Sequence, residues 1–245
     1  MKRSGRWLVA ITGCMALATG AGWWWQERET RHFIPPDDTA FVASFASPSA
    51  ADSPATRAEL DELLALQAVR TPEQVKAART DRKTEVWQFY GALGLDPNDA
   101  PDLPKLDRLA EQVEDDVRLA VRSAKEHFRR LRPFEIEPRI DNCIDNVKAD
   151  LSYPSGHAAF GWSMAYLLSR LVPERRPELE QRAAMFARQR LVCGVHFPSD
   201  IEAGRIAALR VLAEMEKNPA FRAAADAAAE ELRAALGLPP ATPSN

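Results

Sequence analysis

A histidine closes a tight turn in the stretch Tyr-Pro-Ser-Gly-His at residues 153–157. Gly156 allows close backbone approach, and the apolar run after His157 predicts the start of a helix. The free N–H groups and the positive dipole end of a helix N-terminus favour an anion. His157 would stand beside that anion, where it could donate a proton. Taken alone, this pattern is equally typical of a simple turn that binds nothing.

Two cations precede this turn. Lys125 and Arg132 are seven residues apart, which places them on one face of a helix, two turns from each other. Pro133 is expected to end that helix and to leave Arg132 free to reach sideways. By itself, such a run is most typical of a solvated basic helix face, and we interpret Arg129 and Arg130 in that way.

A second histidine follows a third cation. Arg190 precedes His196 by six residues, with Gly194 between them, which suggests a turn. Asp200 lies four residues after His196. A carboxylate at that spacing can accept a hydrogen bond from one ring nitrogen and leave the other free as a nucleophile. A lone His-x-x-x-Asp is nevertheless more often a surface pair.

The three stretches together supply three cations, two histidines, a carboxylate and an anion-binding turn. These parts suit phosphoryl transfer, in which catalysis consists mainly of positioning the reactants and stabilising charge on the equatorial oxygens.

The chain contains three motifs in this order: Lys-x6-Arg-Pro, Pro-Ser-Gly-His and Arg-x5-His-x3-Asp. Together they resemble the three-part signature of the phosphatidic acid phosphatase type 2 (PAP2) superfamily. That superfamily includes the vanadium haloperoxidases. The match is closer to the bacterial class A nonspecific acid phosphatases. The similar strings are Arg122–Lys125, Ser152–His157 and Arg190–Gly194. The likeness extends from about Phe33 to the C-terminal helix.

Two residues depart from the family pattern. Gln189 stands where the superfamily usually has Ser, and Ala158 where class A enzymes usually have Thr. Neither position is catalytic in the family, so we expect altered affinity and intact chemistry.

The resemblance implies a metal-free and cofactor-free mechanism. His196 would attack phosphorus and form a phosphohistidine, while Asp200 orients His196. His157 would protonate the leaving oxygen and then take a proton from water, which predicts an acid optimum. The remaining implied residues bind phosphate: Lys125, Arg132, Ser155, Gly156 and Arg190.

The predicted fold is all-α, a single compact helical bundle of the acid phosphatase/vanadium haloperoxidase type. With 245 residues and 46% apolar content, one domain is the default, and we place it at 57–237. A capping box at Thr56 and Glu59 should open the first helix, and Thr71 should cap the second. Apolar residues keep helical period through about 105–132. Further helices are expected from His157, at 177–190, at 198–217 and at 219–236.

Residues 1–25 predict a signal peptide or an N-terminal membrane anchor, because a basic start precedes 19 uncharged residues, Trp7 to Trp25. Cleavage, lipidation at Cys14 and retention as an anchor all remain open, and each places the enzyme in the periplasm or outside the cell. Residues 26–56 predict an extended linker, and 238–245 a disordered tail.

Cys143 and Cys193 remain as an even pair in an oxidising compartment, and a disulfide between them is one hypothesis. Two separate buried cysteines are the alternative. His32 and His127 are interpreted as structural or surface residues.

The substrate class implied is small phosphate monoesters, and a homo-oligomer is expected from the relatives. The net charge of −3 gives no reason to expect nucleic acid. The alternatives are a phosphotransferase acting on alcohols or nucleosides, a vanadium-dependent haloperoxidase, and an inactive anion-binding helical protein. The preferred monoester is left open, with the 91–104 and 134–153 loops expected to decide it.

Overall fold

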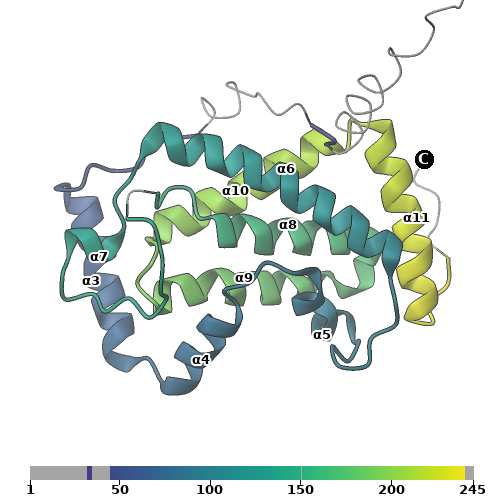
Figure 1. Ribbon diagram of the computed structural model, residues 1–245, viewed down its shortest axis with the longest axis horizontal. Coiled ribbons are helices and arrows are strands. Elements are labelled where there is room, and N and C mark those ends of the chain that lie inside the picture. The colour runs from purple at the N-terminus through teal and green to yellow at the C-terminus, as the bar shows by residue number, and fades with distance from the viewer. Residues whose placement is uncertain (1–31, 35–44, 150, 241–245) are drawn as a thin grey trace, which may run out of the picture. The chain divides into compact units, whose positions relative to one another are not determined.

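The computed structural model describes residues 32–34, 45–149 and 151–240, and these form helices joined by loops, without a β-strand (Figure 1). They all lie in one compact unit, His32–Asn245. The all-α, single-domain prediction is therefore confirmed. The predicted signal peptide or anchor, part of the 26–56 linker and residues 241–245 of the tail lie outside the described residues.

The elements follow one another along the chain without long interruptions except before α6 and α8. They are α3 (Pro54–Val69), α4 (Pro72–Thr80), the 3₁₀ helix η1 (Val86–Phe89), α5 (Tyr90–Leu93), α6 (Pro104–Phe128), α7 (Pro133–Ile136), α8 (Gly156–Leu171), η2 (Pro173–Arg175), α9 (Arg176–Val192), α10 (Pro198–Met215) and α11 (Pro219–Ala235). None of the helices in the described ranges is both long enough and apolar enough to cross a membrane.

Helix α8 lies at the centre of the bundle and packs against α6, α9, α10 and α11 (Figure 1). It is apolar on most of its circumference, as expected for a helix surrounded by others. Gly204 of α10 lets that helix approach the first turn of α8: a Cβ at this position would lie 2.5 Å from the Ser155 carbonyl oxygen. The start of α8, where His157 lies, is thus held directly against α10.

Helix α6 is amphipathic, and its buried face includes Leu106, Val113 and Val121. As predicted, Lys125 lies in its last turn. The helix ends at Phe128 rather than at Arg132, because Arg129 adopts a left-handed conformation with φ 45°. Pro133 therefore does not end a helix but begins the short helix α7 within the predicted 134–153 loop, which is otherwise largely irregular.

The starts of the first two described helices test the two predicted caps. The predicted capping box at Thr56 and Glu59 is wrong: α3 starts at Pro54, and Ser53 caps it by accepting a hydrogen bond from the Thr56 N–H at 3.2 Å. The cap at Thr71, with Gln74 completing the capping box, is confirmed. Helix α4 stops at Thr80, because the following residues form a turn before η1.

Cys143 and Cys193 form a disulfide with 4.8 Å between their Cα atoms. The bond joins the loop between α7 and α8 to the turn that follows α9. In that turn, Gly194 has φ +60°, and a Cβ there would lie 2.4 Å from Ile140 Cγ2. At the other end of the chain, Leu238 N–H donates to the Arg233 carbonyl, so ordered contacts continue past the predicted start of the tail.

The close approach at Gly204 predicts the effect of adding one methyl group. In Gly204→Ala, the new Cβ would meet backbone atoms that cannot turn away. We expect the free energy of unfolding to fall by about 1–3 kcal/mol, measured by urea denaturation. Gly91→Ala is the matched control, because nothing lies within 4 Å of its added Cβ; equal losses in both variants would contradict the packing argument.

Candidate active site

His196 lies in the turn before α10 and is almost completely buried. Its Nδ1 is 3.2 Å from Asp200 Oδ2, and its Nε2 is 3.2 Å from Arg132 Nη1. An acceptor on one side and a donor on the other favour the tautomer that carries its proton on Nδ1. Burial, and then the Arg132 guanidinium, hold the pKa of His196 well below its usual range. These effects favour the neutral ring, with the lone pair on Nε2.

Asp200 stands at the third position of α10, where a carboxylate can accept from the helix start. Its Oδ2 accepts from the Phe197 N–H at 2.9 Å and from Ser152 Oγ at 2.6 Å, in addition to His196. Its Oδ1 accepts from Arg130 Nη1 at 2.7 Å. Burial opposes ionisation, but these contacts outweigh it and lower the pKa of Asp200 to about 2.

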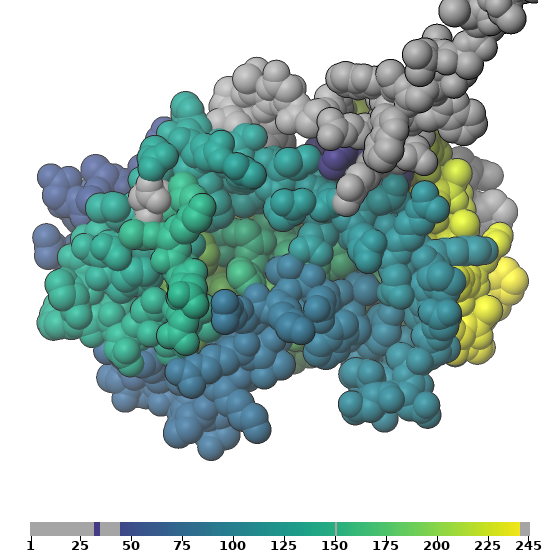
Figure 2. Space-filling view, viewed as in Figure 1, coloured from purple at the N-terminus to yellow at the C-terminus, as the bar shows by residue number. Residues whose placement is uncertain are grey.

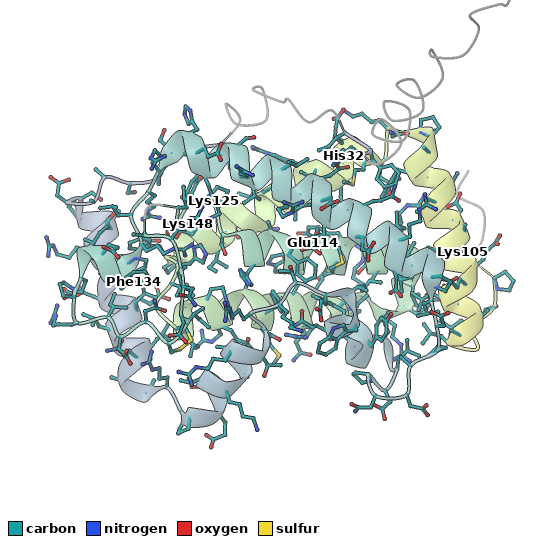
Figure 3. The ribbon with its side chains drawn as sticks, viewed as in Figure 1. His32, Lys105, Glu114, Lys125, Phe134 and Lys148 are labelled. Carbon is teal, nitrogen blue, oxygen red and sulfur yellow. A yellow bond between two sulfur atoms is a disulfide. The ribbon has the colours of Figure 1, made fainter. Side chains whose placement is uncertain are left out.

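Lys125 and Arg132 meet at the loop between α7 and α8. Lys125 Nζ donates to the Leu151 carbonyl at 2.6 Å, and Arg132 Nη2 donates to the same carbonyl at 3.2 Å. Arg132 also donates through Nε to the Lys148 carbonyl, and Figure 3 labels Lys125 at the end of α6 and Lys148 in the loop. Burial and the Arg132 guanidinium lower the pKa of Lys125 to about 7. Burial lowers the pKa of Arg132 to about 10.

Arg190 is the third predicted cation and is buried at the end of α9. One terminal nitrogen donates to the Ala78 carbonyl of α4. Its Nε is buried and has no hydrogen-bond partner among the described residues. A buried guanidinium that keeps a free donor is unusual unless an anion completes its coordination.

His157 lies in the first turn of α8. Ser155 caps this helix by accepting from the Ala158 N–H at 3.3 Å, and its own N–H donates to the Asp200 carbonyl. The ring of His157 stacks on Phe186, and its Nε2 is 2.8 Å from the Arg82 carbonyl. Burial, then the positive charge of Arg190, lowers the pKa of His157 to about 4.

A pocket of about 240 Å³ opens beside Lys125, Gly156 and His157. Its apolar side is formed by Val117, Val121 and Phe160. Its polar lining residues are Thr84, Glu114, Arg118 and Arg122. Figure 2 shows a hollow in this part of the surface, between the teal atoms of α6 and the blue atoms of the segment that follows α4.

Glu114 lies eleven residues before Lys125, which is three helical turns and the same face of α6 (Figure 3). Its Oε1 accepts from Thr84 Oγ1 at 2.6 Å, and burial raises the pKa of Glu114. The pocket therefore has a cationic end with His157 and a carboxylate farther along α6.

The structure brings the predicted residues together from five segments: the end of α6, the residue before α7, the start of α8, the end of α9 and the start of α10. Contacts or mutual electrostatic effects link Lys125, Arg132, His157, Arg190, His196 and Asp200, and Ser155 and Gly156 begin the helix that carries His157. Within the described ranges, no group of three or more His, Cys, Asp or Glu side chains is placed to hold a metal ion.

The interpretation of Arg130 as part of a solvated face is wrong. Its side chain is 5% exposed and forms ion pairs with Asp200 and Glu59. The error follows from the predicted helix end, since an α6 that continued to Arg132 would have carried Arg130 on its surface. Ser152 and Glu114 were also not predicted as site residues, although Ser152 begins one of the family strings.

Comparison with known proteins places this chain in a family. Residues 117–217 match the model of the PAP2 superfamily. A non-specific acid phosphatase of Providencia stuartii is 38% identical over 55% of each chain, so this match spans about half of that relative. A non-specific acid phosphatase of Salmonella typhi is 30% identical over 76% of this chain and 77% of its own. An acid phosphatase of Zymomonas mobilis is 34% identical over 58% of this chain and 54% of its own.

The chain therefore belongs to the PAP2 superfamily, and within it to the non-specific acid phosphatases of class A. This confirms the resemblance that the three motifs indicated. Each of these relatives is named as an acid phosphatase.

The depressed pKa of Lys125 predicts how anion affinity depends on pH. Above about pH 7, Lys125 loses its charge in the anion-free protein, so we expect sulfate to bind at least about fivefold more weakly at pH 8.5 than at pH 6. Sulfate keeps its charge across this range, and calorimetric titration measures its affinity. Lys125→Arg should lose most of this pH dependence, because arginine stays charged at both values, and the remainder reflects His157, whose pKa a bound anion raises. A wild-type affinity independent of pH would contradict the prediction.

Proposed function

We propose that this protein hydrolyses small phosphate monoesters through a phosphohistidine on His196. The observation that carries the proposal is the His196 imidazole, held with Nδ1 at Asp200 and Nε2 at Arg132. In this state Nε2 has a lone pair beside cations that can bind a phosphoryl group. Membership of the acid phosphatase family supports the same chemistry.

In the first step, His196 Nε2 forms a bond to phosphorus while the bond from phosphorus to the ester oxygen breaks. The bonding electron pair goes to the leaving oxygen, which takes a proton from His157. Asp200 stabilises the positive charge that develops on His196. In the second step, water attacks phosphorus, His157 accepts the proton of this water, and the P–N bond breaks to release inorganic phosphate.

Lys125, Arg132 and Arg190 would neutralise the equatorial oxygens, together with the Ser155 hydroxyl and the Gly156 N–H. Losing one such donor typically raises the barrier by about 3 kcal/mol. The charges in the site also favour activity at acid pH. Bound phosphate offsets the cations that depress the pKa of His157, so in the complex His157 retains its proton to a higher pH than in the empty site.

The pocket beside His157 is suited to the leaving group. Its lining residues Val117, Val121 and Phe160 offer an apolar surface to the alcohol part of the ester. Since His157 borders this pocket, a leaving oxygen there would lie near the proton donor.

We further infer that the enzyme acts in the periplasm or outside the cell. The disulfide between Cys143 and Cys193 supports this location, because such bonds persist in oxidising compartments. The basic and then apolar N-terminal segment supports it as well. It stays a prediction that the protein forms a homo-oligomer and that it does not bind nucleic acid.

Hydrolysis of p-nitrophenyl phosphate tests the function directly. With excess EDTA, we expect activity that is highest on the acid side between pH 4 and 8 and declines as His157 loses its proton. His196→Ala should lower kcat by more than about a thousandfold, because it removes the nucleophile. His127→Ala, a change at an exposed histidine of α6, is the control and should keep wild-type kcat. Activity that EDTA abolishes, or that survives in His196→Ala, would contradict the proposal.

A further inference from the structure

Arg130 lies between two carboxylates that come from distant parts of the chain. Its Nη1 donates to Asp200 Oδ1 at 2.7 Å and to Ser199 Oγ at 2.8 Å. Its Nη2 donates to Glu59 Oε2 at 2.9 Å. The guanidinium also lies over the ring of Phe197, 3.8 Å from its centroid. These contacts fix the guanidinium in one position, so it is a rigid donor to Asp200.

Glu59 holds the other side of this arrangement. It projects from α3, and its second oxygen, Oε1, accepts from the Ser199 N–H in the first turn of α10 at 2.6 Å. A carboxylate at this helix end is favoured by the free N–H groups and by the dipole. Glu59 thus fastens both Arg130 and the turn that carries Asp200.

The two oxygens of Asp200 have different partners. Arg130 contacts Oδ1, whereas His196, Ser152 and the Phe197 N–H all contact Oδ2. A carboxylate can rotate about its Cβ–Cγ bond, and the direction of Oδ2 sets the plane of the His196 ring. A strong donor on Oδ1 therefore restricts the rotation that would release His196.

We propose that Arg130 is a positioning residue for the phosphoryl transfer. It holds the Asp200 carboxylate so that Oδ2 keeps the His196 ring in its reactive orientation, and Glu59 holds Arg130 in turn. The inference rests on the proposed function of His196, and it adds a residue that touches neither the substrate nor the reacting ring.

The charge of Arg130 also matters for Asp200. Burial disfavours the carboxylate, while hydrogen bonds and charge from His196, Arg130 and Ser152 favour it. Removing Arg130 should therefore raise the pKa of Asp200 and move the acid limb of the kcat/KM profile to higher pH. The ionisable groups that face or influence Asp200 from the surrounding elements are His196, Arg130, Lys125, Arg132, Tyr153 and, through Arg130, Glu59.

The test compares Arg130→Met and Arg130→Lys with wild type on p-nitrophenyl phosphate. For Arg130→Met, we expect kcat to fall about ten- to a hundredfold, KM to change by less than about threefold, and the acid limb to move up. Arg130→Lys keeps the positive charge but cannot donate to Asp200 and Glu59 at the same time in the geometry of a guanidinium. Its kcat should therefore lie between those of wild type and Arg130→Met. Arg233→Met is the matched control, because Arg233 is equally buried and pairs with Glu174 through two hydrogen bonds remote from the site; its kcat should remain that of wild type.

A measurement without turnover separates this inference from the proposed function. Nitrogen NMR of ¹⁵N-histidine-labelled protein reads the tautomer of His196, which should be protonated on Nδ1 in wild type and mixed in Arg130→Met. An unchanged tautomer, or wild-type kcat and pH profile in the folded variant, would overturn the proposal. If Arg130→Met does not fold, wild-type kcat in Arg130→Lys would overturn it. An inactive wild type would instead refute the phosphatase function, and the tautomer would still decide the role of Arg130.

Discussion

The geometry of the site depends on one buried negative charge, the carboxylate of Asp200. A charge removed from water must be compensated by donors in the protein, or the group becomes neutral. Asp200 receives donors from the loop before α8, from the turn before α10 and from the segment after α6. Satisfying this carboxylate therefore brings together the segments that carry His196, His157 and the phosphate-binding cations.

A second constraint is the excess of buried positive charge beside Asp200. Arg132 acts electrostatically on both Lys125 and Arg190, and the donors of these three cations are directed mainly to backbone carbonyls. Carbonyl dipoles compensate a cation incompletely, which is why burial depresses the pKa of all three. An anion with several oxygens would relieve this cost, so the affinity for a phosphoryl group follows from the same packing that assembles the site.

Sequence reasoning succeeded where the structure is determined locally. The position of Lys125 follows from helical periodicity, and the cap at Thr71 follows from neighbouring residues. It failed where contacts between distant segments decide the outcome. The left-handed turn at Arg129 ends α6 early, and the pairing of Arg130 with Glu59 and Asp200 spans some seventy residues on either side. No local pattern distinguishes such an arginine from a solvated one.

The most direct test of the account is to trap the covalent intermediate. Wild-type enzyme mixed with a ³²P-labelled monoester and quenched in alkali within milliseconds should carry a phosphoryl group that is stable to base and labile to acid. Peptide mapping should locate it on His196, and His196→Ala should carry none. A kinetically competent enzyme without any phosphoenzyme, or with the label on another residue, would contradict the account.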